Sequence, residues 1–143
     1  MTNALLAIDD FIHKKFHLYK NVDGSPEKQI FLIKKAFSLS WKLPEFEAND
    51  FICAYIAVAR KRAGDIYLID DSESFCVSDS FIGYSGNTID CYYSIIMEDK
   101  KIVLKIKELD LHNNKWITTF KGTIDEACEF YAEQQKKIGR AHV

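Results

Sequence analysis

The stretch "IDCYYSIIMEDKKIVLKIKEL", residues 89–109, indicates the fold class most clearly. In its second half, three branched apolar residues fall on one side of an extended chain: Ile102, Leu104 and Ile106. Three lysines fall on the other side: Lys101, Lys105 and Lys107. The polar residues "MEDKK" between the halves are typical of a hairpin connection. The stretch therefore predicts two antiparallel strands, the second of which has one face toward a core and one toward solvent.

Similar short segments rich in β-branched and aromatic residues lie on both sides of this stretch. They are "DIYLI" (65–69), "SFCVS" (74–78) and "KWITTF" (115–120). "HNNK" (112–115) suits a hairpin turn, and "GYSGN" (83–87) is typical of a loop. Together these segments predict an antiparallel meander of five or six strands.

Helical patterns precede the predicted sheet. Apolar residues recur at spacings of three and four and predict a first helix: Leu5, Ile8, Ile12, Phe16 and Tyr19. Ser25 suits an N-cap and Pro26 the first helical position, so a second helix is expected to begin there and to end before Pro44. Residues 45–63 fit a buried helix or a buried strand, and their five alanines favour the helix.

A closing helix is expected from the sequence "TIDE", in which Thr123 and Glu126 have the spacing of a capping box. Ile124, Ala127, Cys128 and Tyr131 should form its inward face. The predicted fold class is α+β, with N-terminal helices, the meander sheet and a C-terminal helix packed on it. One domain is expected over residues 1–137. The last residues, "IGRAHV" (138–143), match the translation of a common sequencing adapter and are expected to be a non-native tail.

Composition narrows the function classes. The four cysteines are scattered and none lies in a C-x-x-C motif, which argues against a structural zinc site. No signal peptide and no apolar run of membrane-spanning length is found, so a cytoplasmic location without membrane contact is expected. No glycine-rich phosphate motif is present, and no cofactor is expected.

Two candidate sites with possible chemistry each have a simpler explanation. His13 and His17, with Asp9, have helical spacing for a metal, but a solvated face is favoured over a metal site. Asp110 and His112 have the spacing of an oriented base, but the turn that follows favours an exposed histidine. No catalytic residue is therefore assigned, and the protein is not expected to be an enzyme.

The strongest clue to function is an acidic window, residues 65–99, which contains eight carboxylates and no lysine or arginine. It carries a charge of −8 although the chain carries only −2, so the remaining residues carry +6. Aromatic residues lie among the carboxylates: Tyr67, Phe75, Phe81, Tyr84, Tyr92 and Tyr93. A chance excess of surface aspartates is the plain alternative. The functional interpretation is a negative face with aromatic anchors that binds a basic protein, whereas phosphate, and hence nucleic acid, would be repelled.

In size, layout and charge the chain resembles the small immunity proteins of bacterial toxin systems, such as those of contact-dependent inhibition. The resemblance implies tight binding to a cognate toxin domain, often a nuclease, whose site is blocked. The partner-binding residues would be Asp70, Asp71, Glu73, Asp79, Tyr67, Phe75 and Tyr84. Two alternatives remain open: a phage- or plasmid-encoded inhibitor of a host nucleic-acid enzyme, and a small ligand-binding or enzymatic domain with a pocket near His112.

Overall fold

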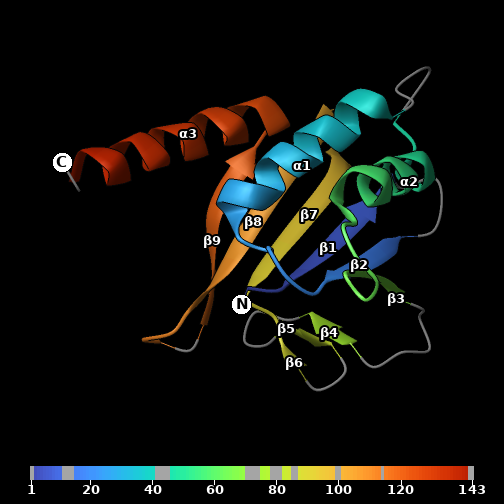
Figure 1. The fold of residues 1–143 in the computed structure, drawn as a ribbon, viewed down its shortest axis with the longest axis horizontal. Helices are drawn as coiled ribbons and strands as arrows, with labels where there is room; N and C mark the ends of the chain where they lie inside the picture. The colour runs from blue at the N-terminus through green and yellow to red at the C-terminus, as the bar shows by residue number, and fades with distance from the viewer. Residues whose placement is uncertain are drawn as a thin grey trace.

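A computed structural model describes residues 2–10, 15–40, 46–69, 75–77, 82–84, 87–98, 101–113 and 115–141. For residues 75–77, 82–84, 87 and 138–141 it describes the backbone alone. Within these ranges the chain is an α+β protein, as predicted: three helices cover a six-stranded sheet, and three short strands form a second sheet (Figure 1).

The strands of the large sheet lie in the order β3-β2-β1-β7-β8-β9. Their bounds are β1 Ala4–Asp9, β2 Phe16–Lys20, β3 Ile66–Ile69, β7 Cys91–Glu98, β8 Lys101–Asp110 and β9 Lys115–Gly122. Neighbours are antiparallel except β1 and β7, which pair in parallel from Ala4 with Cys91 to Asp9 with Ile96. The sheet is therefore mostly antiparallel, but it is not a simple meander, because the N-terminal hairpin is joined to the meander by a parallel pair.

The prediction of a first helix over residues 5–19 is wrong, because β1 and β2 occupy this segment as an antiparallel hairpin. The five residues Ala4 to Ile8 are all fully buried. The sequence of a strand that is covered on both faces is a continuous apolar run. "ALLAI" is such a run, and it lacks the alternation of apolar and polar residues by which a strand is usually recognised. The apolar spacings of three and four in this segment therefore arise from two strands and their connection.

The other helix predictions are confirmed. The helices are α1 Pro26–Leu39, α2 Ala48–Ala59 and α3 Ile124–Ala141. Helix α2 settles the ambiguous segment 45–63 in favour of helix. At the start of α3 the Thr123 N–H donates to Glu126 Oε1 at 3.0 Å, and the Glu126 N–H donates to Thr123 Oγ1 at 3.1 Å, which is the predicted capping box.

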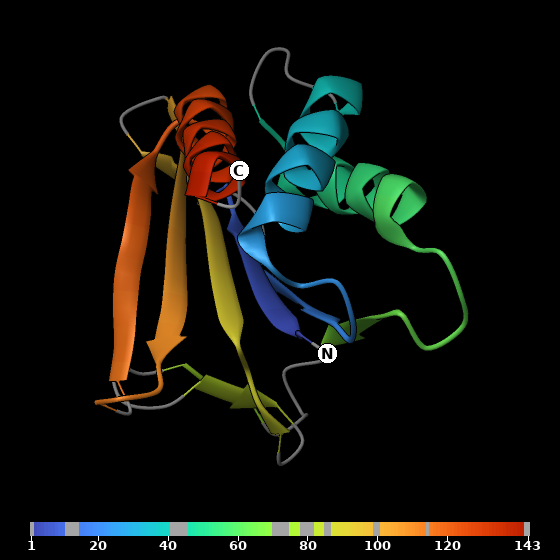
Figure 2. The ribbon, with the colours of Figure 1, turned by 60° about the vertical axis from the view of Figure 1, so that its left-hand side comes forward.

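The second sheet consists of β4 Phe75–Val77, β5 Ile82–Tyr84 and β6 Asn87–Thr88, at the bottom of Figures 1 and 2 and away from the helices. The prediction of a loop over 83–87 is wrong for Gly83, Tyr84 and Asn87, which belong to β5 and β6. Strands of two or three residues are too short to produce a pattern of alternation.

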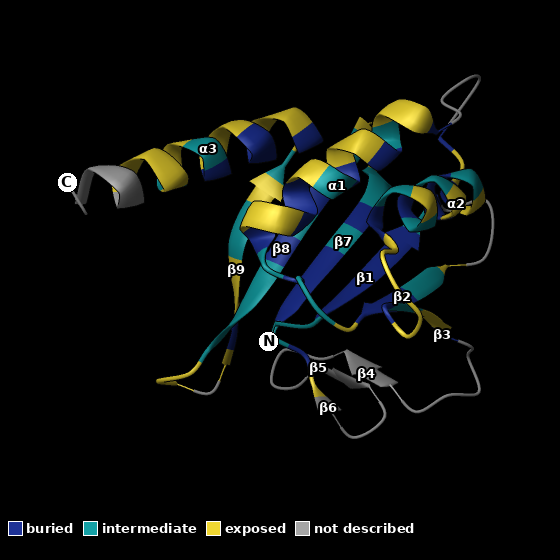
Figure 3. Cartoon of the chain, viewed as in Figure 1, coloured by how far each residue is buried: buried dark blue, intermediate teal, exposed yellow. Residues whose placement is uncertain are grey.

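All three helices lie on one face of the large sheet, with α1 between α2 and α3 (Figure 2). The main core fills the space between them, and the four residues predicted to face inward on α3 are all buried in it. The opposite face carries a second buried cluster: Leu5, Ala7, Tyr19, Ile69, Ile89, Tyr92 and Trp116. The central strands β1 and β7 are accordingly the most buried part of the sheet (Figure 3).

Candidate functional site

Of the predicted partner-binding residues, Tyr67 is the one whose side chain the structure describes. Tyr67 lies in β3, at the edge of the large sheet. Phe75 begins β4 and Tyr84 ends β5, and the register of the second sheet pairs these two residues directly. The four predicted acidic residues lie outside the described residues: Asp70, Asp71, Glu73 and Asp79.

Strand β3 exposes two large side chains. Tyr67 is 46% exposed on the face of the sheet that also carries Tyr19, and Leu68 is 55% exposed on the opposite face. The Tyr67 ring packs against the buried ring of Tyr19, with ring centroids 6.1 Å apart, and this contact holds the Tyr67 ring in position on the surface. Within the described part of the chain β3 pairs with β2 alone. Its other edge therefore presents backbone hydrogen-bonding groups beside exposed apolar side chains.

The acidic window is less uniform than the sequence indicated. Asp65 is buried and forms an ion pair with Lys20. The Asp90 carboxylate accepts a hydrogen bond from the Asn3 backbone N–H at 3.1 Å, which ties β1 to the start of β7. Glu98 lies 4.0 Å from the ammonium of Lys121. The three carboxylates of the window that the structure describes are therefore already engaged within the fold.

Two aromatic residues of the window are also structural. Tyr93 is fully buried and its hydroxyl donates to the Gly24 carbonyl at 2.6 Å. Tyr92 is 6% exposed and belongs to the second cluster. Burial raises the pKa of both hydroxyl groups. These residues hold the sheet and the turn before α1 together, and they are not anchors for a partner.

The candidate chemical groups also have local roles. His112 is exposed in the turn after β8, and its backbone N–H, not its ring, donates to Asp110 Oδ1 at 3.0 Å. A hydrogen bond from the Asn113 side chain, with that from the His112 N–H, holds the pKa of Asp110 below its usual range. His13 lies outside the described residues, whereas Asp9 lies in β1 and His17 in β2. Among the described residues no group of three histidine, cysteine or acidic side chains fits a metal ion.

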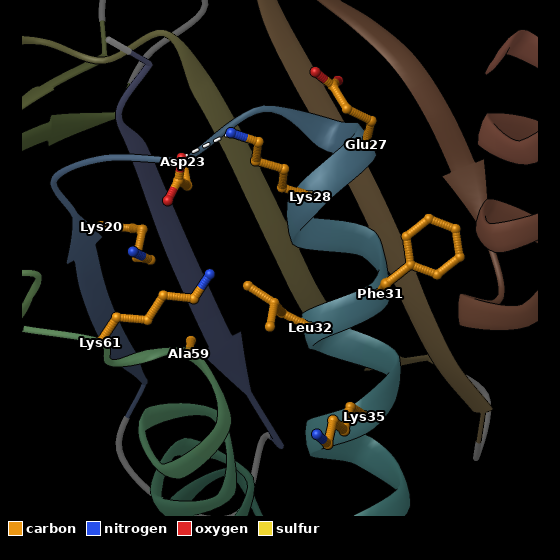
Figure 4. Close-up of a pocket in the computed structure, with 9 residues that line it drawn as sticks. All are labelled: Lys20, Asp23, Glu27, Lys28, Phe31, Leu32, Lys35, Ala59 and Lys61. Carbon is orange, nitrogen blue, oxygen red and sulfur yellow. Dashed lines mark hydrogen bonds and ion pairs between the residues drawn. The ribbon is translucent and has the colours of Figure 1, made fainter.

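A feature that sequence reasoning missed is a pocket between α1, the end of β2 and the connection after α2 (Figure 4). We call it the lysine pocket. Its volume is about 320 Å³. Four lysines line it: Lys20, Lys28, Lys35 and Lys61. Three apolar residues and two acidic residues complete the lining: Phe31, Leu32, Ala59, Asp23 and Glu27.

The turn before α1 builds one side of the lysine pocket. Asp23 has a φ of 59°, in the left-handed region that aspartate tolerates better than most residues. Gln29 fixes the turn by donating to the Asp23 carbonyl at 2.9 Å, and Gln29 in turn accepts a hydrogen bond from the buried hydroxyl of Tyr55. The Asp23 carboxylate accepts a hydrogen bond from the Lys28 ammonium at 2.8 Å. This contact lowers the pKa of Asp23 and raises the pKa of Lys28, so the pair stays ionised near neutral pH.

Lys20, which lines the lysine pocket, forms a buried ion pair with Asp65. Burial acts to raise the pKa of Asp65. The hydrogen bond from Lys20, the backbone N–H of Lys61 and the charges of Lys20 and Arg62 together hold that pKa below its usual range. The Lys61 N–H donates to Asp65 Oδ2 at 2.9 Å. This hydrogen bond fixes the position of the Lys61 backbone. Arg60 and Arg62, on either side of Lys61, are exposed.

The sequence held only part of the signal for this pocket. Lys28, Leu32 and Lys35 have the spacing of one helical face, so three residues could have been grouped from the pattern alone. Lys20 and Lys61 come from segments far apart in the sequence, which only the pairing of β2 with β3 brings together. The basic residues "RKR" (60–62) directly follow the end of α2 and are exposed.

Comparison of the chain with protein-family models, with curated proteins and with solved structures finds no match in any of the three. The described helices include none with the length and apolar character needed to cross a bilayer.

Proposed function

We propose that this chain is an inhibitor protein of the immunity type, which binds a basic protein domain and blocks its activity. The observation that carries the proposal is the exposure of Tyr67, 46%, on the edge strand β3. An aromatic ring that packs on Tyr19 and stays about half exposed is a suitable anchor for a protein partner, because such anchors supply most of the affinity at interfaces. No described strand pairs with the edge of β3 opposite β2, so the backbone groups of this edge are available to pair with a partner.

Acidic residues follow Tyr67 closely in the sequence. Asp70, Asp71 and Glu73 belong to the connection between β3, which ends at Ile69, and β4, which begins at Phe75. They follow Tyr67 by only a few residues. Carboxylates beside a partly apolar contact raise the association rate with a basic partner, while the aromatic and aliphatic side chains slow dissociation.

The chemistry of this surface favours a nucleic-acid enzyme as the partner. A nuclease binds phosphate groups with lysine and arginine, so its cleft is basic. In the proposed complex the carboxylates after β3 pair with those basic side chains, and Tyr67, Phe75 and Tyr84 supply the apolar contacts. The inhibitor itself carries out no reaction. A cognate toxin and a host nucleic-acid enzyme fit this chemistry equally, and the identity of the captured protein separates them.

The test begins with capture of a partner by the full chain from its native host, followed by reconstitution of the purified pair. A basic partner, a 1:1 complex and loss of the partner's activity are expected. Association should slow as salt rises, because the attraction is between exposed charges. Tyr67→Ala should mainly accelerate dissociation.

Two charge-reversal variants sharpen this test. In the first, Asp70, Asp71 and Glu73 are changed to lysine, and association should slow strongly and lose most of its salt dependence. In the second, Glu47, Glu129 and Glu133, exposed residues of the helical layer, are changed to lysine as a control with the same change in net charge. Equal slowing in both variants would show a general charge effect and would contradict the proposed surface. A partner that stays fully active in the complex would contradict the inhibitor function.

A further inference from the structure

We infer that the lysine pocket binds a small amphipathic anion, a compact apolar body that carries one carboxylate or phosphate group. This inference goes beyond the proposed function, because the pocket lies between α1, β2 and the connection after α2, and none of the proposed partner-binding residues lines it.

The positive charge of the pocket determines that its ligand should carry a negative charge. Of its four lysines, Lys20 is paired with Asp65 and Lys28 with Asp23. Lys35 and Lys61 form no ion pair with any residue that the structure describes. A lysine ammonium is a donor of three hydrogen bonds and accepts none, so two such groups at one concave site favour a ligand with anionic acceptor oxygens.

The position of each lysine is set by the fold. The backbone of Lys61 is anchored on the buried carboxylate of Asp65, and in Figure 4 the Lys61 side chain extends toward Leu32 across the pocket. Lys35 lies one turn further along the same face of α1 as Leu32, and its ammonium lies on the pocket side of the helix (Figure 4). The Glu27 side chain points away from the space between these lysines, so it does not oppose the two ammonium groups there (Figure 4).

The walls of the pocket set the size and character of the rest of the ligand. Leu32 and Ala59 line the pocket together with the two lysines, and the aliphatic stems of the lysines extend this apolar lining. The volume of about 320 Å³ lies at the lower end of the range for small-molecule sites. A single aromatic ring with one anionic group has suitable size and chemistry, whereas a simple inorganic anion would leave the apolar wall uncovered.

The test uses phenyl phosphate, benzoate, inorganic phosphate and neutral benzamide as probes, with the full chain labelled for amide NMR and with calorimetry for affinity. Phenyl phosphate or benzoate should bind in preference to inorganic phosphate and to benzamide, with the largest shifts at residues 28–35 and 59–62. The stronger of the two aromatic anions identifies the preferred head group. Equal binding of benzamide would overturn the anionic part of the inference, and equal binding of inorganic phosphate would overturn the apolar part.

Two double variants separate this site from general attraction to lysine. Lys35→Met with Lys61→Met retains much of the aliphatic stems and should raise the dissociation constant of the preferred probe by about tenfold or more. Lys115→Met with Lys136→Met makes the same charge change at exposed lysines that line none of the pockets described, and it should leave binding unchanged. Equal weakening in both variants, or no weakening in the first, would overturn the inference. All four positions are exposed, so the variants should fold normally.

Discussion

The ammonium of Lys20 and the carboxylate of Asp65 form an ion pair inside the protein, with side chains 1% and 0% exposed. Lys20 ends β2, and Asp65 lies directly before β3. The second carboxylate oxygen of Asp65 accepts the Lys61 N–H, and its backbone carbonyl accepts the Asn21 N–H at 2.9 Å. One aspartate therefore joins the hairpin, the turn before α1 and the connection after α2.

Removal of the carboxylate should be strongly destabilising. Asp65→Ala leaves the Lys20 charge buried without its partner, and the expected loss in the free energy of unfolding is about 3–5 kcal/mol. Denaturant unfolding measures this loss, and Glu129→Ala, at an exposed position on α3, is the control, with an expected change within about 0.5 kcal/mol. The double change Lys20→Met with Asp65→Leu should recover part of the loss, because it removes both charges. A loss in Asp65→Ala as small as that of the control would show that the buried pair does not stabilise the fold.

The same pair should contribute to acid sensitivity. The folded-state pKa of Asp65 is held below its usual value, and the unfolded value is about 3.9. A depressed carboxyl pKa stabilises the folded state fully above the unfolded pKa, and this contribution is lost as pH falls through the folded value. The difference in unfolding free energy between the wild type and Asp65→Asn should thus be constant above about pH 5 and shrink below about pH 4. A difference that grows on acidification would contradict this assignment.

Gly24 lies where the turn before α1 passes against the start of β1. A Cβ added at Gly24 would lie 2.6 Å from the carbonyl carbon of Asn3 and 2.9 Å from the Cβ of Ala4. Because the nearest atoms are backbone, Gly24→Ala should destabilise the protein by about 1–3 kcal/mol. Gly122→Ala is the matched comparison, since its nearest contacts are the side chains of Phe120 and Glu126, which can shift. Thermal unfolding of the two variants should rank them in this order, and the reverse ranking would contradict the close approach at Gly24.

The described cysteines should differ in reactivity. Cys53 is exposed on α2, whereas Cys91 is buried, and burial, with the negative charge of Glu108, raises the pKa of the Cys91 thiol to about 12. At pH 8 only about one part in ten thousand of Cys91 would be thiolate, which is the reactive form. Iodoacetamide labelling of the native protein, in a Cys76→Ser background, should therefore modify Cys53 long before Cys91. Equal labelling rates in the native state would contradict this burial, and labelling in denaturant provides the reference.

The α+β class, α1, α2, α3 and most strands were predictable because local patterns coincide with the tertiary structure. Ile102, Leu104 and Ile106 alternate with lysines on a strand whose inner face is buried, and the capping box at Thr123 is a local feature of four residues. Strand β1 was not predictable in this way, since its residues Ala4 to Ile8 are buried on both faces and local alternation is lost.

The candidate site also contains features that the sequence pattern indicates and features that only tertiary contacts create. Tyr67 is exposed, and its role as an anchor stays a prediction. A count of charges along the chain cannot distinguish a surface aspartate from Asp65, whose partner lies 45 residues earlier. Likewise Lys61 and Leu32 line one pocket only because β2, α1 and the end of α2 pack together. Contacts of this kind depend on the tertiary structure, which cannot be predicted from the spacing of apolar residues or from the composition.

The parallel pairing of β1 with β7 has a consequence for the order of assembly during translation. Strand β1 receives its second neighbour only after residues 91–98 have been made. Until then the nascent hairpin presents an unpaired, apolar inner edge, which is an aggregation hazard, and long-range pairing of this kind slows folding. A chain interrupted before Cys91 should therefore depend on chaperones, and an N-terminal fragment should be rescued by a separately supplied C-terminal fragment that carries β7.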